Sequence, residues 1–254
     1  MTTHYAGRPT PDFPAELWPI GLRRRALQGL VPFKTRATYP KGSTILMRGR
    51  PVEGVFLLLA GAAKLSISSG EGATIILGIA RPGEILGLSA AIAGAPSEIT
   101  AETLVPSQLC FIPRSDFLRT LNYNGQSCLQ VVEMLSEQLR DALELIRTIG
   151  GAQSVRKKLA ALLLSWAESL GVQTERGIEI ELQLNEEEIG QMICASRATV
   201  SRLLAAFKRD RILSVNGPAF YIHKKAVLEY LATSIRRRVT VPKDEEDEGT
   251  DFLQ

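Results

Sequence analysis

Short apolar runs separated by glycine dominate the chain from residue 33 to residue 112. Each run has the length of a β-strand, and turn-forming residues recur between the runs at nearly regular spacing. Many short strands separated in this way predict a β-sandwich or β-barrel. The clearest predicted strands are 55–59, 63–67, 74–79 and 108–112. A short helical segment is predicted before them, at about residues 15–30.

The pattern changes to helical periodicity between residues 125 and 149. Apolar residues recur four and three positions apart in turn, which is a heptad seam that favours a partner helix. The seam consists of Cys128, Val132, Leu135, Leu139, Ala142, Ile146 and Ile149. We predict that its middle residues, 132 to 146, contact the same helix of a second copy, since no second helix of this kind is evident. Packing against the chain's own β domain is the alternative.

Gly150 and Gly151 end this helix and form a predicted hinge. Residues 155–170 have the pattern of a further amphipathic helix. Residues 178–184 alternate between apolar and polar, as a half-exposed strand does.

Residues 185–207 predict two short helices joined by a tight turn. Asn185 can cap the first helix and Ser196 the second, since both side chains accept hydrogen bonds from free backbone N–H groups. Three glutamates, 186–188, follow Asn185 where the helix dipole favours acids. The apolar face of the second helix consists of Val200, Leu203, Leu204 and Phe207.

The opposite face of the second helix is polar near its N-terminal end. A helix-turn-helix protein presents this end to base edges in the major groove, and arginine fits O6 and N7 of guanine. The predicted DNA-contact residues are Ser196, Arg197, Ala198, Thr199, Ser201 and Arg202. An ordinary helix hairpin with a solvated face is the alternative. Two apolar runs around Asn216-Gly217 favour DNA binding, because this hairpin signal predicts a wing directly after the helix.

Composition and charge are those of a two-domain globular protein. The chain has 254 residues and a formal net charge of +3, although residues 243–251 carry six acids and one base. The rest of the chain therefore has a basic excess, which suits contact with phosphates. We expect the acidic tail to be disordered. Neither a signal peptide nor a transmembrane run is evident, and we expect a cytoplasmic protein.

No catalytic or metal-binding motif accompanies these features. The sequence contains no Gly-x-Ser-x-Gly elbow, HExxH, P-loop or credible Cys/His pair. Its three cysteines, Cys110, Cys128 and Cys194, are far apart and lack metal-ligand spacing. We therefore expect neither an enzyme nor a metal site.

The order of these elements, together with several motifs, resembles one known family. The motif stretches are 41–46, 54–61, 81–88, 101–103, Glu188-Ile-Gly-Gln and 196–202. Over residues 15–235 the chain is similar to the cAMP receptor protein/FNR family of bacterial transcription regulators. The resemblance implies an α+β fold with an N-terminal cyclic-nucleotide-binding-type β-roll (jelly-roll), a long dimerisation helix and a C-terminal winged helix-turn-helix. The expected bounds are 1–124, 125–150, 151–238 and 239–254 for the sensor domain, dimer helix, DNA-binding domain and acidic tail.

The resemblance also implies a function. It predicts a homodimeric, sequence-specific transcription regulator, either an activator or a repressor, that binds a palindromic site in double-stranded DNA. RNA polymerase is the further partner that the resemblance implies, and no membrane association is expected. A cyclic-nucleotide-type regulatory module without DNA binding is the alternative. Family half-sites contain TGA, and Arg202 is expected to contact its guanine, with Ser201 and Arg197 beside it. Ala198 departs from the family pattern, in which a glutamate accepts a hydrogen bond from cytosine.

The predicted sensor pocket lacks the family's cAMP-binding groups. Members that bind cAMP use a Gly-Glu pair for the ribose and an Arg-Ser pair for the phosphate. Here the matching run is Gly87-Leu88-Ser89, residues 95–100 contain no Arg or Lys, and the purine-facing helix positions are Leu143 and Glu144. A cyclic phosphate buried without a cation would lose its hydration, and no ion pair would offset that cost. These five residues remain the pocket candidates, but cAMP is not the expected ligand.

Other sensing chemistries fit the sequence no better. Iron–sulfur sensing needs clustered cysteines near the N-terminus, and none precedes Cys110. The only histidines, His4 and His223, are poorly placed for haem. A thiol sensor at Cys110 or Cys128 stays open, beside the commoner case of a buried core cysteine. No cofactor is identified, and the remaining alternatives are an unknown small-molecule effector or a domain without ligand control.

Overall fold

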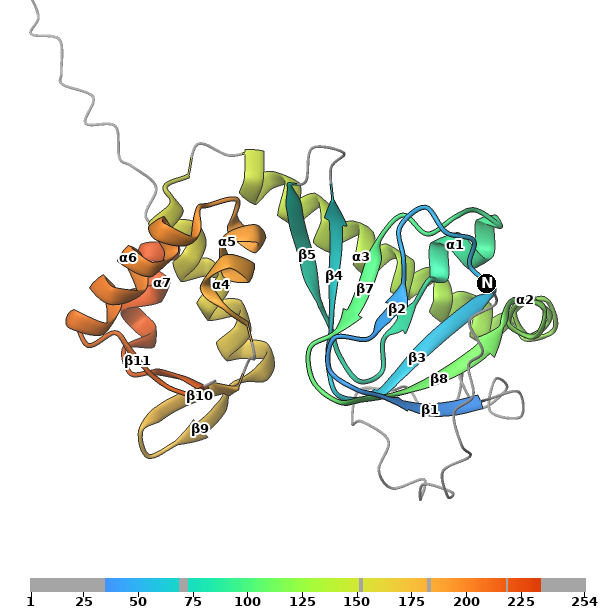
Figure 1. The fold of residues 1–254 in the computed structure, drawn as a ribbon, viewed down its shortest axis with the longest axis horizontal. Helices are drawn as coiled ribbons and strands as arrows, with labels where there is room; N and C mark the ends of the chain where they lie inside the picture. The colour runs from blue at the N-terminus through green and yellow to red at the C-terminus, as the bar shows by residue number, and fades with distance from the viewer. Residues whose placement is uncertain (1–34, 69–72, 151–152, 182–183, 218, 234–254) are drawn as a thin grey trace, which may run out of the picture.

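The computed structural model describes residues 35–68, 73–150, 153–181, 184–217 and 219–233. In chain order these residues form a β-roll, one long helix and a winged-helix domain (Figure 1). The predicted helix at residues 15–30 and the acidic tail lie outside the described residues.

Two four-stranded antiparallel sheets make up the β-roll. The first has the order β1-β8-β3-β6, and its strands are β1 (Thr35–Tyr39), β3 (Gly54–Ala60), β6 (Ile85–Leu86) and β8 (Ser107–Pro113). The second has the order β2-β7-β4-β5, and its strands are β2 (Thr44–Leu46), β4 (Ala63–Ser68), β5 (Thr74–Ala80) and β7 (Thr100–Thr103). All four predicted strands are present, but the short helix α1 (Leu88–Ala93) interrupts the segment that was predicted as β-strands throughout.

Strand β3 is apolar almost throughout because both of its faces are covered. Phe56 and Leu58 point into the β-roll, where they pack with Leu109. Val55 and Leu57 belong to a second buried cluster on the other face of the sheet. A strand between two apolar layers loses the polar alternation that a half-exposed strand would show.

Three helices cover the outer face of the first sheet. They are α1 (Leu88–Ala93), α2 (Arg114–Tyr123) and α3 (Gly125–Gly150). Phe117 of α2 and Val131 of α3 pack against β3 in the cluster that contains Val55 and Leu57. The first turns of α3 therefore pack on the β-roll, and this 26-residue helix then runs behind β7, β4 and β5 in the view of Figure 1, toward the winged-helix domain.

The winged-helix domain follows α3. Its elements are α4 (Val155–Leu170), β9 (Val172–Thr174), β10 (Gly177–Glu181), α5 (Glu186–Ile193), α6 (Arg197–Arg209), β11 (Leu213–Asn216), β12 (Ala219–Ile222) and α7 (Lys225–Thr233). Strands β11 and β12 form the predicted wing, and Gly217 supplies the left-handed backbone, with φ 58°, that the turn requires. The wing continues into a four-stranded sheet of order β11-β12-β10-β9.

None of the helices in the described part of the chain is both long and apolar enough to cross a membrane.

Candidate DNA-binding site and sensor loop

A reciprocal pair of hydrogen bonds fixes the start of α5. The Glu188 backbone N–H donates to Asn185 Oδ1 at 2.9 Å, and the Asn185 backbone N–H donates to Glu188 Oε2 at 3.0 Å. This capping box satisfies two backbone donors that the helix itself leaves free. The predicted role of Asn185 as a cap is confirmed.

The turn between α5 and α6 depends on a glycine that the sequence pattern did not single out. A Cβ atom at Gly190 would collide with the carbonyl oxygen of Ala195 across the turn. Cys194 ends α5 in a left-handed conformation with φ 53°, and it is exposed. The tight packing of the two helices therefore requires the absence of a side chain at position 190.

Helix α6 has the two faces that its sequence predicts. Ser196 caps it by accepting a hydrogen bond from the Thr199 backbone N–H at 3.3 Å. Val200, Leu204 and Phe207 are buried in the core of the domain. The outward residues are Arg197, Ala198 and Arg202, which are exposed, and Ser201, which is half-buried.

Arg202 is held in a defined position on this outer face. Its Nη2 donates to Thr199 Oγ1 at 3.3 Å, and its Nε donates to the Ala198 carbonyl at 3.3 Å. The Thr199 hydroxyl also lies 3.0 Å from Ser196 Oγ. Thr199 therefore orients the guanidinium of Arg202, a positioning role that the sequence did not indicate.

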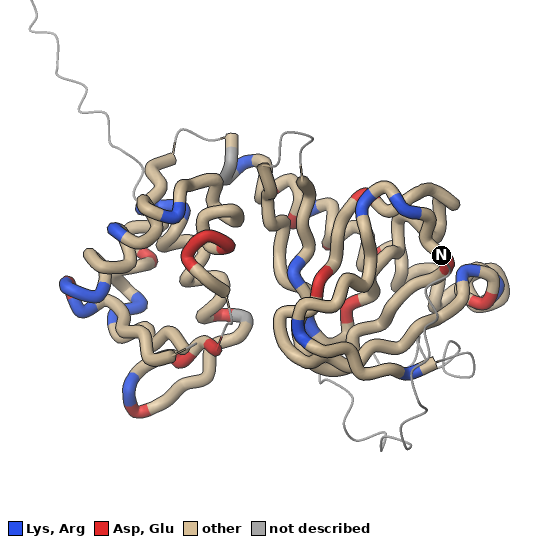
Figure 2. Tube along the Cα trace, in the orientation of Figure 1, with Lys and Arg blue, Asp and Glu red and all other residues tan. Residues whose placement is uncertain are grey.

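Arg197 lies beside an acid from α5. Its Nε is 3.9 Å from Glu186 Oε2, and its side chain is 74% exposed. Further basic residues gather at the end of the winged-helix domain that lies far from the β-roll, whereas the start of α5 is acidic (Figure 2). The basic residues toward the end of α6 and just after it are Lys208, Arg209 and Arg211. The outer side of α6 thus combines arginines at its N-terminal end with positive charge at its C-terminal end, as a phosphate-contacting surface does.

The run Gly87-Leu88-Ser89, which was predicted to line the sensor pocket, leads into helix α1. Gly87 precedes α1 with φ 84°, and Leu88 is 1% exposed in the apolar cluster with Phe117. Leu88 is therefore a core residue, which corrects its assignment as a pocket candidate. Ser89 is exposed, and its hydroxyl donates to Glu98 Oε1 at 2.9 Å.

Two acidic residues, Glu84 and Glu98, belong to the 81–88 and 95–100 stretches of the sensor domain. Glu98 lies in the stretch where cAMP-binding relatives carry their phosphate-binding arginine. Burial raises the pKa of Glu84, Arg81 partly opposes this, and the carboxylates of Asp141 and Glu137 on α3 raise the pKa further. At position 98 the chain therefore offers a carboxylate and no cation to a phosphate.

The exposed apolar line on α3 differs in part from the predicted seam. Its members are Leu129, Val132, Leu139, Leu143 and Ile146, each between 51% and 64% exposed. Leu135 is instead partly buried against the β-roll cluster, so less of its side chain is left for a second copy to cover. Ala142 is exposed beside this line, and Glu144 pairs with Arg147 at 2.5 Å. Leu143, a predicted pocket residue, therefore lies on the line that would face a second copy.

The cysteines are unequal in exposure. Cys110 is fully buried in the apolar cluster between the first sheet and the helices that cover it, whereas Cys128 is exposed on α3. Among the residues that the structure describes, no three His, Cys, Asp or Glu side chains are grouped so that they could hold a metal ion.

Both the β-roll and the winged-helix domain match known protein families. Residues 36–124 match the cyclic nucleotide-binding domain family, and residues 157–231 match the Crp-like helix-turn-helix domain family. The chain belongs to the CRP/FNR family of transcription regulators. Members of the CRP/FNR family are regulators and not enzymes, and the second match disfavours a cyclic-nucleotide module without DNA binding.

Individual CRP/FNR relatives resemble the chain over most of its length. The global nitrogen regulator of Nostoc is 27% identical over 193 residues, 75% of this chain and 86% of that protein. The CRP-like cAMP-activated global transcriptional regulator of Mycobacterium tuberculosis is 23% identical over 206 residues, 80% of this chain and 90% of that protein. The structure of FixK2 from Bradyrhizobium japonicum has a TM-score of 0.71 and 22% identity, and it covers 80% of this chain and 98% of that one.

Proposed function

We propose that this CRP/FNR-family protein is a homodimer that binds a palindromic site in double-stranded DNA through α6. The observation that carries this proposal is the outer face of α6, where Arg197, Ala198 and Arg202 are exposed and Thr199 orients Arg202. These residues lie toward the N-terminal end of the second helix of a winged helix-turn-helix, which is the end that reads base edges.

The exposed line on α3 supports the dimer. Its large apolar side chains recur at heptad spacing, and a second copy of the helix would remove them from water. A monomer would leave them in solvent, and contiguous apolar surface of this kind marks an interaction site. We therefore assign Val132, Leu139 and Ile146 to the dimer contact as predicted, and we add Leu129 and Leu143.

The side chains of α6 suggest how each half-site is recognised. Arg202 is proposed to bind the guanine of a TGA half-site, with Ser201 and Arg197 making neighbouring base or phosphate contacts. Ala198 cannot accept a hydrogen bond from a cytosine amino group, so one position of each half-site should be relaxed or prefer a thymine methyl group. Two-fold symmetry places the half-site centres about one helical turn apart.

The remaining assignments rest on the family resemblance. The proposed domain bounds are 1–124, 125–150, 151–238 and 239–254, and the two family matches fall within the first and third of them. We place the protein in the cytoplasm, with RNA polymerase as its partner at promoters. We also propose that an effector other than cAMP, or no effector, acts at the β-roll.

Titration calorimetry with cAMP should detect no micromolar binding to the full-length protein. The reason is that Leu88 occupies the place of the ribose-binding acid and is buried, while Glu98 puts a negative charge in the phosphate-binding stretch. Glu98→Arg is the matched control, since it puts a cation at the same point, and it should bind cAMP more tightly than the natural protein. Micromolar or tighter binding by the natural protein would refute this prediction.

Selection of duplexes from a random pool by a gel-shift assay tests the proposed function directly. The protein should enrich an inverted repeat, with a conserved guanine in each half and one relaxed position. Enrichment of no sequence at all would contradict sequence-specific DNA binding.

A further inference from the structure

The first helix of the helix-turn-helix lies against the chain's own β-roll. Helix α5 packs along β5 of the second sheet. Ile76 of β5 and Leu104 are buried in the same apolar cluster as Ile189 and Met192 of α5. These contacts join two domains that are separated in the chain by the whole of α3.

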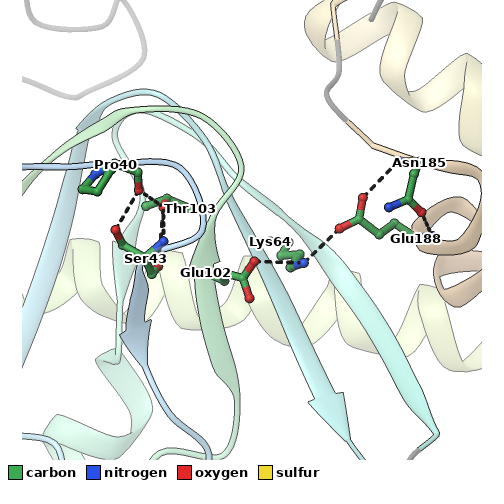
Figure 3. A network of polar contacts seen from close by, with 7 residues as sticks. All are labelled: Pro40, Ser43, Lys64, Glu102, Thr103, Asn185 and Glu188. Atoms are coloured by element: carbon green, nitrogen blue, oxygen red, sulfur yellow. Dashed lines mark hydrogen bonds and ion pairs between the residues drawn. The ribbon is translucent and has the colours of Figure 1, made fainter.

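Lys64 of β4 connects the same two domains by a polar contact (Figure 3). Its Nζ is 2.9 Å from Glu188 Oε1 of α5 and 3.1 Å from Glu102 Oε1 of β7. The side chains of Lys64 and Glu188 are only 20% and 15% exposed, so solvent screens their attraction less than that of a surface pair. Burial lowers the pKa of Lys64, but hydrogen bonds to Glu188 and Glu102 outweigh it and raise the pKa above its ordinary value. Lys64 therefore stays charged at neutral pH.

Glu188 is anchored on the helix side as well as on the β-roll side. Its second carboxylate oxygen, Oε2, accepts the Asn185 backbone N–H in the capping box. The carboxylate is thus fixed to the first turn of α5, and Lys64 holds the start of the helix itself. The contact therefore restrains the orientation of the helix-turn-helix relative to the β-roll.

This docked arrangement leaves the recognition face open. Arg197, Ala198 and Arg202 of α6 are exposed while α5 contacts the β-roll. The contact between α5 and the β-roll therefore orients α6 without covering it.

We propose that the Lys64–Glu188 ion pair positions the recognition helix and thereby sets the half-site spacing that the dimer accepts. A dimer binds a palindrome tightly when both recognition helices are already held at the right separation, because ordering loose domains on binding costs affinity. The inference rests on the proposed function, but neither residue belongs to the proposed DNA-contact set. Lys64 and Glu188 are positioning residues.

The test compares full-length natural protein with Lys64→Gln and Glu188→Gln on three duplexes. These are the best-selected palindrome, the same palindrome with its spacer changed by about 5 base pairs, which is half a helical turn, and a single half-site. Glutamine at 188 keeps an oxygen for the Asn185 N–H, so the cap is preserved. Glu102→Gln is the matched control, because it removes a carboxylate from Lys64 and leaves the interdomain pair in place.

Both positioning variants should bind the best palindrome about five- to thirtyfold more weakly, since each dimer loses two such pairs. They should also discriminate less between the two spacers and bind the half-site as the natural protein does. The double variant should lose no more than either single variant, because the two substitutions break one contact. Glu102→Gln should retain spacer discrimination.

Unchanged spacer discrimination in both positioning variants would overturn the inference. Tighter binding of the variants to the best palindrome would also overturn it, because it would mean that the contact with the β-roll holds α6 in a position that opposes DNA binding. If the natural protein itself prefers no palindrome, the proposed function fails instead, and that result is distinct because it appears without any substitution.

Discussion

Leu139→Glu should convert the protein to monomers and abolish its binding to the palindromic site. Leu139 is 61% exposed at the middle of the exposed line on α3, where a second helix would bury it. Burying one leucine side chain contributes about 1.5–3 kcal/mol, and the dimer contains two of them. The substitution also places two like charges at an apolar contact, where unpaired charge is costly. Sedimentation velocity at micromolar concentration measures the result.

Gln138→Glu is the control for this experiment. It adds the same charge at the neighbouring exposed position, which lies off the apolar line. This variant should remain a dimer and bind DNA normally. A natural protein that sediments only as a monomer at micromolar concentration would refute the dimer. A Leu139→Glu variant that remains dimeric would show that the dimer contact does not lie at this position of α3.

Arg202→Ala should cost about 1–3 kcal/mol of binding free energy on the selected palindrome and less on random DNA. We expect a base contact because Arg202 is exposed near the N-terminal end of α6, the end that a helix-turn-helix presents to base edges. Equilibrium binding to both duplexes at one fixed salt concentration measures the difference. Equal losses on the two duplexes would assign Arg202 to the phosphate backbone.

Lys208→Ala provides the contrasting case on the same helix. Lys208 is exposed in the last turn of α6, away from the N-terminal end that reads bases. It should weaken binding to both duplexes alike and reduce the salt dependence of binding by about one charge per subunit, as a phosphate contact does.

Local patterns predicted most of the secondary structure that matters for function. The bounds of α4, 155–170, follow from amphipathic periodicity, and the wing follows from Asn216-Gly217. The faces of α6 follow from the spacing of its apolar residues. These features depend on neighbours in the sequence, so that periodicity and capping are sufficient to find them.

The register of the α3 seam could not be decided in this way. Two heptad lines run along the helix, and both contain Val132, Leu139 and Ile146. Leu135 belongs to one line, and Leu129 and Leu143 belong to the other. The β-roll favours the second line, because it partly buries Leu135 and leaves Leu129 and Leu143 in solvent.

Contacts between distant parts of the chain were also invisible in the sequence. Lys64 and Glu188 are separated by 124 residues, and a lone lysine in a strand gives no sign of its partner. Helix α1 was missed because it has only six residues and starts at a glycine with no side-chain cap. The burial of Leu88 follows from that short helix, which explains why it was taken for a pocket residue.

The stoichiometry of the complex on the selected duplex tests the central claim most directly. Sedimentation or native mass spectrometry with full-length protein should find two chains on each palindrome, and a duplex with one half-site scrambled should bind much more weakly. A complex of one chain per duplex, with no preference for the intact palindrome over the scrambled one, would contradict a homodimeric reader of palindromic DNA.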